Sequence, residues 1–193
     1  MRPAIRYWRR PVARRAAAAA AASFEVRLCS SNASAAAAAE ARSLVPLALE
    51  PGDGLFAVKA LAEPAGFLRL ADDAIERSDQ LRSRARSGDF SGHSLLQVLD
   101  AMSDTICLVI DAAELCRNVH PDDRYRAAAE DCFDKMAMYI SELNTDVALY
   151  KKLLASDTDE SVRLTLNLEQ QRMSRLLREE FEINGIHLDE TGR

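Results

Sequence analysis

Three histidines, His93, His120 and His187, are the residues of this 193-residue chain best suited to acid–base or metal chemistry. None of them begins an HExxH motif, in which two histidines one helical turn apart bind zinc and the glutamate activates water. Cys116 and His120 are four residues apart and would share one face of a helix, which makes half of a metal site. A closed zinc site needs four ligands, and no other two can be named. We therefore interpret Cys116 as a core residue and His120 as a capping or exposed residue.

Acidic residues are grouped at two places that resemble the carboxylate pairs of acid–base catalysts. They are Asp72 with Asp73, and Glu179 with Glu180 and Glu182. Adjacent residues on a helix point in different directions, so these groups do not converge on one point. We expect both groups to lie on solvated helix faces.

The four cysteines have neither CxxC spacing nor the density of a disulfide scaffold. Three of them, Cys107, Cys116 and Cys132, fall on predicted apolar helix faces. We interpret them as small hydrophobic core residues. The residue types and spacings thus indicate no catalytic residue and no metal ligand in this chain.

The element around which any site must be built is a long helix predicted over 94–119. Its apolar residues recur at alternating steps of four and three, at Leu95, Leu99, Met102, Ile106, Val109, Ala113 and Cys116. Such a stripe covers one helix face and needs a partner. The capping-box spacing of Ser94 and Gln97 predicts the helix start. His120-Pro121, followed by two aspartates, predicts its end and the start of the next helix.

Further helices are predicted on both sides of this one. Amphipathic spacing predicts a helix over 70–86, after a broken apolar segment over 55–67 that we expect to pack as a strap. Beyond Pro121 the stripe resumes through Leu154, as one bent helix or as two nearly collinear ones. A last helix is predicted from the acids at 157–160 to Phe181, and Asn184-Gly185 is a stop signal. The predicted fold class is therefore all-α, a bundle of long antiparallel helices.

Charge divides the chain into two unequal parts. A composition of 48% hydrophobic and 28% charged residues is typical of a soluble globular protein with one domain. Residues 1–42 hold eight Arg and two Glu, net +6, whereas the other 151 residues hold 17 basic and 28 acidic side chains, net −11. An acidic body lacks the clustered Lys and Arg that nucleic acid requires. No apolar run approaches the roughly 20 residues of a membrane span. We therefore expect that the chain neither binds nucleic acid nor spans a membrane.

The basic head has the composition of an organelle transit peptide, because six arginines precede the first acid and an alanine run over 16–22 follows. A secretory signal is the alternative, but its apolar region normally holds Leu or Val. The stretch 27–31 resembles a mitochondrial processing site two residues after Arg27, which predicts cleavage between Cys29 and Ser30. We expect residues 1–29 to be a transit peptide, 30–51 a low-complexity linker that is frayed helix or disorder, and 52–193 a helical domain.

Several segments resemble one protein family, in the same order along the chain. They are Gly54-Leu55-Phe56 with Pro64, Gly66 and Phe67, then His120-Pro121, Glu130-Asp131-Cys132, residues 142–150 and residues 181–189. Together they resemble the N-terminal helical region of the thimet oligopeptidase family of zinc metallopeptidases. The Gly-Leu-Phe segment resembles the mitochondrial branch of that family rather than its cytosolic relatives.

The resemblance implies an almost entirely helical fold, with zinc at the floor of a deep channel that admits short or unfolded peptides. It also implies a role in the mitochondrial matrix, where a short further piece is trimmed from imported precursor proteins. The family's HExxH motif and downstream Glu have no counterpart in this chain. No catalytic or metal residue is therefore carried over, and this chain is expected to bind no zinc by itself.

Two hypotheses about function follow. In the first, the chain is the N-terminal helical part of a mitochondrial zinc endopeptidase whose chemistry lies in the remainder. In the second, it is a non-catalytic helical binding module that docks on a full-length peptidase or another helical partner. A new helix is expected to begin near 186–189, close to the last residue, which favours the first hypothesis. An unmatched apolar stripe over 95–116 predicts self-association of the isolated chain.

Overall fold

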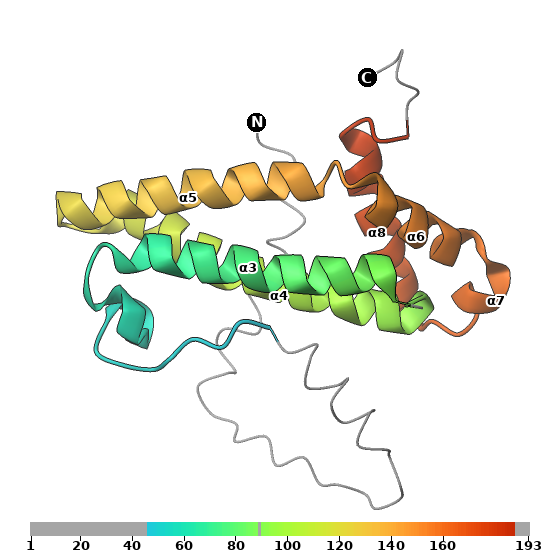
Figure 1. The fold of residues 1–193 in the computed structure, drawn as a ribbon, viewed down its shortest axis with the longest axis horizontal. Coiled ribbons are helices and arrows are strands. Elements are labelled where there is room, and N and C mark those ends of the chain that lie inside the picture. The colour runs from blue at the N-terminus through green and yellow to red at the C-terminus, as the bar shows by residue number, and fades with distance from the viewer. Residues whose placement is uncertain (1–45, 89, 188–193) are drawn as a thin grey trace, which may run out of the picture.

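The computed structural model describes residues 46–88 and 90–187, and within these ranges the chain is predominantly helical (Figure 1). Two short 3-10 turns, Leu55–Ala57 and Lys59–Ala62, precede six α-helices. These are α3 Gly66–Ser87, α4 Gly92–Val119, α5 Asp123–Leu143, α6 Val147–Thr158, α7 Glu160–Arg163 and α8 Leu168–Ile183. The described part of the chain contains no strand beyond a single bridge between Pro51 and Val58. The predicted all-α class is confirmed.

Three long helices form the body of the bundle, because α3, α4 and α5 lie side by side and alternate in direction (Figure 1). The predicted stripe of α4 is buried, and none of its seven residues is more than 2% exposed. Both α3 and α5 pack against α4, so the stripe finds its partners within the chain. The expectation that this stripe is unmatched is therefore wrong. Self-association itself stays a prediction.

A different apolar stripe on α4, near the C-terminal end of the helix, is partly exposed. Leu108, Leu115 and Val119 are 38%, 50% and 66% exposed, and they follow one another at helical spacing. Near the middle of the helix, the backbone N–H of Leu47 donates to Thr105 Oγ1 at 3.1 Å, so the chain near residue 47 contacts α4 there. We call Leu108, Leu115 and Val119 the exposed α4 stripe.

The boundaries of α4 agree with the sequence at one end only. The helix begins at Gly92 rather than Ser94, with Ser91 as its N-cap. Ser94 lies inside the first turn, where its Oγ accepts from the backbone N–H of Ser91 at 3.3 Å, so the predicted Ser94–Gln97 capping box is wrong. The end at Val119 is confirmed. Beyond Pro121, Asp122 caps α5 by accepting from the backbone N–H of Arg124 at 2.8 Å.

Helix α3 begins at Gly66, four residues earlier than the sequence indicates, so the strap is shorter than the predicted 55–67. Gly66 is required here by a close contact between the strap and the helix. A Cβ at this position would lie 1.7 Å from the carbonyl oxygen of Ala60 in the second 3-10 turn. The lack of a side chain thus lets the strap lie directly on the first turn of α3.

The second half of the chain contains one more break than predicted. Helices α5 and α6 are separate, divided by a turn at 144–146, but α6 is inclined to α5 rather than nearly collinear with it (Figure 1). The helix predicted from 157–160 to Phe181 is two helices, because the chain leaves helical geometry between Arg163 and Leu168. The stop at Asn184-Gly185 is confirmed, and Gly185 has a φ of 76°.

The start of α8 is fixed by a capping box that the apolar pattern concealed. The side chain of Asn167 accepts from the backbone N–H of Gln170 at 2.9 Å, and the Gln170 side chain accepts from the Asn167 N–H at 3.0 Å. We expect Asn167→Ala to lower the free energy of unfolding by about 1 kcal/mol, because an orphan N–H loses its acceptor. Asn167→Ser should retain most of it. Urea unfolding of the two variants compares them, and equal losses would contradict the cap.

An ion network fixes the α5–α6 turn on α3. Arg82 of α3 places its Nε 2.6 Å from Asp146 Oδ2 and its Nη1 2.8 Å from Glu142 Oε1. The Asp146 side chain is only 3% exposed. Its Oδ1 also accepts from the backbone N–H groups of Ala148 and Leu149, both at 3.1 Å, so it caps α6. One carboxylate therefore both starts α6 and joins it to α3.

This network makes stability depend on pH. Burial acts to raise the pKa of Asp146, but hydrogen bonds from Arg82 and from the backbone N–H of Leu149 outweigh it and hold the pKa below its ordinary 3.8. A depressed pKa adds stability that is fully present above the unfolded-state value and is lost as pH falls through the folded-state value. We expect the difference in urea midpoint between the native chain and Asp146→Asn to shrink below about pH 4. A difference that stays constant down to about pH 2 would contradict this assignment.

None of the described helices is both long enough and apolar enough to cross a membrane.

Candidate functional site

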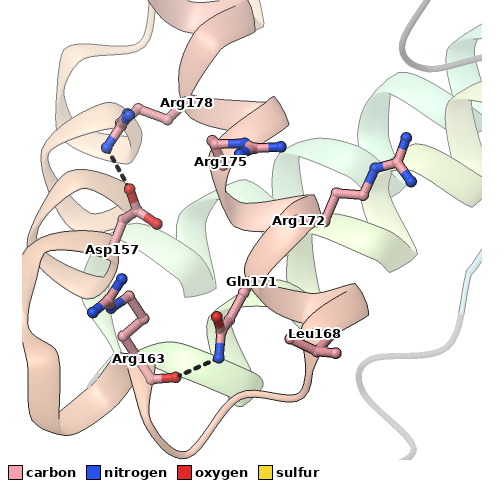
Figure 2. A pocket seen from close by; sticks show the side chains of 7 residues that line it. All are labelled: Asp157, Arg163, Leu168, Gln171, Arg172, Arg175 and Arg178. Carbon is pink, nitrogen blue, oxygen red and sulfur yellow. Dashed lines mark hydrogen bonds and ion pairs between the residues drawn. The ribbon is translucent and has the colours of Figure 1, made fainter.

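A cleft of about 470 Å³ lies where α6, α7 and α8 meet, and arginines dominate its lining (Figure 2). The lining residues are Asp157, Arg163, Leu168, Gln171, Arg172, Arg175 and Arg178. Four arginines and one aspartate give the lining a formal charge of +3. We call this site the arginine cleft. It is a concentrated positive site in the part of the chain that is otherwise acidic.

Most of the lining comes from one side of α8. Leu168, Gln171, Arg172, Arg175 and Arg178 follow at steps that keep them on the same helix face. Ser174, Leu177 and Phe181 lie on the other side and are buried. Because the buried side packs on α6 and α4, the polar side of α8 faces outward and forms the wall of the cleft.

Asp157, near the end of α6, anchors the inner part of the cleft. Its Oδ1 accepts from Ser174 Oγ at 3.2 Å, and its Oδ2 is paired with Arg178 Nη1. Arg178 Nε also lies 3.4 Å from Glu182 Oε1. The Asp157 side chain is 12% exposed and the Arg178 side chain 28% exposed, so this pair is held in place and largely compensated.

Gln171 connects α8 to the segment that follows α7. Its Nε2 donates to the carbonyl oxygen of Leu166 at 2.9 Å and, more weakly, to that of Arg163 at 3.3 Å. These bonds tie the segment after α7 to α8, and they set the position of the Arg163 backbone at the edge of the cleft (Figure 2).

The remaining arginines are much less compensated. Among the described residues, neither the Arg163 nor the Arg172 side chain makes a hydrogen bond or an ion pair. Arg175 Nε reaches only Glu179, at 3.8 Å, in a pair that is about half exposed. Figure 2 shows Arg163 and Arg178 near Asp157, while Arg172 and Arg175 extend the other way. The positive charge is therefore spread over α7 and α8 rather than focused on one point.

The residues singled out for metal chemistry do not converge. His120 ends α4, and its Nδ1 accepts from the backbone N–H of Asp122 at 3.1 Å while its ring packs 4.5 Å from that of Tyr125. Cys116 is buried, which raises the pKa of its thiol, and its Sγ lies 3.7 Å from the carbonyl oxygen of Tyr125. His93 contacts Gln170 at 2.6 Å and is far from His120 along the chain. Within the described ranges no three His, Cys, Asp or Glu side chains are grouped to hold a metal ion.

The predicted cleavage residues Cys29 and Ser30 lie outside the described residues. Cys107, Cys116 and Cys132 are buried free cysteines, as predicted, and burial raises the pKa of Cys132 to about 12. For Glu180 the prediction of a solvated face is wrong, because its side chain is only 8% exposed. Its Oε1 accepts no hydrogen bond from any described residue, and burial raises its pKa.

The arginine cleft was missed by sequence reasoning that followed the apolar positions. A signal was present, since Arg172, Arg175 and Arg178 recur every three residues on one helix face. Arg163 had no such signal, because it enters the site only through the break between α7 and α8.

The chain is similar in sequence to curated mitochondrial intermediate peptidases. The protein from Arabidopsis thaliana is 39% identical over 136 residues, which cover 70% of this chain and 19% of that protein. The protein from Mus musculus is 35% identical over 140 residues, or 72% and 20% of the two chains. The protein from Saccharomyces cerevisiae (strain YJM789) is 34% identical over 139 residues, or 70% and 18%. No family model and no solved structure matches the chain.

Fold and site together define an α-helical module whose described residues carry a cationic cleft rather than a grouped set of metal ligands. Its sequence is related to that of the mitochondrial intermediate peptidases, which confirms the resemblance drawn from the segments above. The chain spans about a fifth of the length of the curated relatives it matches.

Proposed function

We propose that this chain is the N-terminal helical portion of a mitochondrial zinc metalloendopeptidase that trims imported precursor proteins in the matrix. The single observation that carries the proposal is identity of 34–39% to mitochondrial intermediate peptidases over about 70% of this chain. The all-helical fold agrees with it. In this proposal the chemistry belongs to the remainder of the peptidase, and the chain by itself cleaves nothing.

The residues present do not fit a zinc site. A catalytic zinc needs three protein ligands and an open position for water, and the described residues offer no such group. No catalytic step is therefore assigned to any side chain of this chain. Its part in the activity is structural, to contribute helices that help enclose the peptide substrate.

The exposed α4 stripe supports a packing role. Three large apolar side chains at one helix face, 38–66% exposed, favour a surface that another helical part of the peptidase covers. The same stripe also favours the second candidate, a non-catalytic module that docks on a separate full-length peptidase.

A graft tests the first candidate. The 139 residues of the Saccharomyces cerevisiae enzyme that match this chain would be replaced by the matching residues of this chain, and processing of a precursor protein would be measured. We expect chelator-sensitive processing by the graft and none by the isolated chain with added zinc. A parent enzyme that lacks the matched segment is the control. A folded but inactive graft, or chelator-sensitive hydrolysis by the isolated chain, would contradict the proposal.

Co-sedimentation separates the second candidate from the first. If the chain docks on a separate full-length peptidase, the purified 193-residue protein should co-sediment with the yeast enzyme, and Leu115→Glu should abolish this. Asp134→Lys changes charge on α5 and serves as control. Light scattering of the isolated chain tests the related prediction of self-association, which a stable monomer would contradict.

We also propose that residues 1–29 direct import and are removed between Cys29 and Ser30. The support is the arginine-rich, acid-poor composition of the head. N-terminal sequencing of the chain recovered from mitochondria should begin at Ser30. An intact Met1 on the imported protein would contradict the cleavage.

A further inference from the structure

We propose that the arginine cleft binds an acidic peptide segment in which at least two carboxylates lie on one side of an extended backbone. This inference does not rest on the proposed function, because it involves neither zinc nor proteolysis. It starts from Arg163 and Arg172, whose side chains have no partner among the described residues although they line a cleft of net charge +3.

The state of each arginine indicates which of them serve as receptors. Arg178 is compensated by Asp157 and Glu182 and is mostly buried, so it shapes the cleft. Arg163 and Arg172 are exposed and uncompensated, and Arg175 has only a weak exposed pair with Glu179. A guanidinium binds carboxylate or phosphate oxygens through paired N–H donors. The receptor groups are therefore Arg163, Arg172 and Arg175.

The spacing of the charges favours a peptide over a single small anion. Arg172 and Arg175 are three residues apart on α8, about 4.5 Å along the helix axis at 1.5 Å per residue, while Arg163 belongs to α7 and lies near Asp157 (Figure 2). An extended peptide rises about 3.3 Å per residue and places alternate side chains on one face about 7 Å apart. Two or three carboxylates on such a peptide can reach receptor arginines on both α7 and α8, whereas one inorganic phosphate meets only one or two of them.

The remaining lining residues agree with a peptide ligand. Leu168 is 83% exposed at the edge of the cleft and offers an apolar contact next to the charges. The side-chain amide of Gln171 already donates hydrogen bonds to two backbone carbonyl groups, so it makes the cleft rigid rather than contacting the ligand. A basic segment, such as the arginine-rich head of this chain, would be repelled. The cleft thus selects acidic segments that carry an apolar residue.

Fluorescence anisotropy with the full 193-residue chain tests this. The probe is a labelled twelve-residue peptide with glutamate at alternate positions and one leucine, at low salt. We expect saturable binding, and a loss of affinity of about tenfold in the double variant Arg163→Gln, Arg172→Gln. Because these two side chains have no partners among the described residues, the variant should keep its circular dichroism spectrum and urea midpoint.

A matched double variant, Arg69→Gln with Arg124→Gln, removes the same charge from exposed arginines of α3 and α5. We expect its affinity to stay within about twofold of the native chain. Equal losses in the two variants would overturn the proposal, because the attraction would then be non-specific. Equal binding of a peptide with glutamine in place of glutamate would also overturn it. Inorganic phosphate that displaces the probe at the probe's own concentration would assign the cleft to small anions instead.

Discussion

Replacing Phe67 with alanine is expected to lower the free energy of unfolding by about 3–5 kcal/mol. The Phe67 side chain is fully buried and is among the largest buried side chains of the chain. It lies in the first turn of α3, next to Gly66, where the strap comes within contact of the helix. Truncation would leave a cavity in the core, because the surrounding side chains relax only partly into the vacated space.

Phe56→Ala is the control, because it removes the same side chain from a much more exposed position. Phe56 is 49% exposed in the first 3-10 turn, so its loss should cost about 1 kcal/mol or less. Urea unfolding followed by circular dichroism gives both values. Equal losses for the two variants would show that Phe67 is not buried as described.

The helix α4 could be predicted because its apolar residues are spaced as they are on the buried face of a helix. Seven apolar residues at steps of four and three have one structural solution, a helix buried along that face. The His120-Pro121 break was predictable for a similar reason, since proline disfavours helical geometry in the residue before it. What the pattern could not show is which elements cover the face, and for α4 the partners are α3 and α5 of the same chain.

Glycine and polar residues gave weaker signals because each has more than one physical role. Gly66 suits a break equally well as a close approach, and only the position of Ala60 decides between them. Asn167 with Gln170 is a capping box, but Val162 and Leu166 before it and Met173 after it keep helical spacing, which concealed the break. Leu166 is buried and Leu168 is exposed, a difference between two nearby leucines that their residue type does not predict.

For the arginine cleft, too, the sequence shows only part of the arrangement. Sequence spacing places Arg172, Arg175 and Arg178 on one face of a helix, but it does not show which of them are compensated. Asp157 reaches Arg178 from α6, a contact set by tertiary packing. The distinction between a structural arginine and a receptor arginine therefore depends on the fold.

Arg82→Met is expected to cost about 2–4 kcal/mol, because it leaves the buried carboxylate of Asp146 without its closest cation. Two backbone N–H groups still bond Asp146, and Arg86 lies 3.7 Å away, so the loss should fall short of that for a fully isolated charge. In the Asp146→Asn background, which retains the cap but not the charge, the same substitution should cost at least about 1 kcal/mol less. Urea unfolding of the four chains completes the double-mutant cycle.

Arg69→Met supplies the control, since Arg69 and Glu63 form a pair whose side chains are 54% and 62% exposed. Its cost should be about 0.5 kcal/mol or less, because solvent already screens both charges. Glu142 and Asp146 both belong to the 142–150 segment that carries the family resemblance, and both contact Arg82. This segment fixes the start of α6 on α3, and α6 in turn supplies Asp157 to the arginine cleft, so the network connects α3 to the cleft. If Arg82→Met cost no more than Arg69→Met, that connection between α3 and the cleft would be wrong.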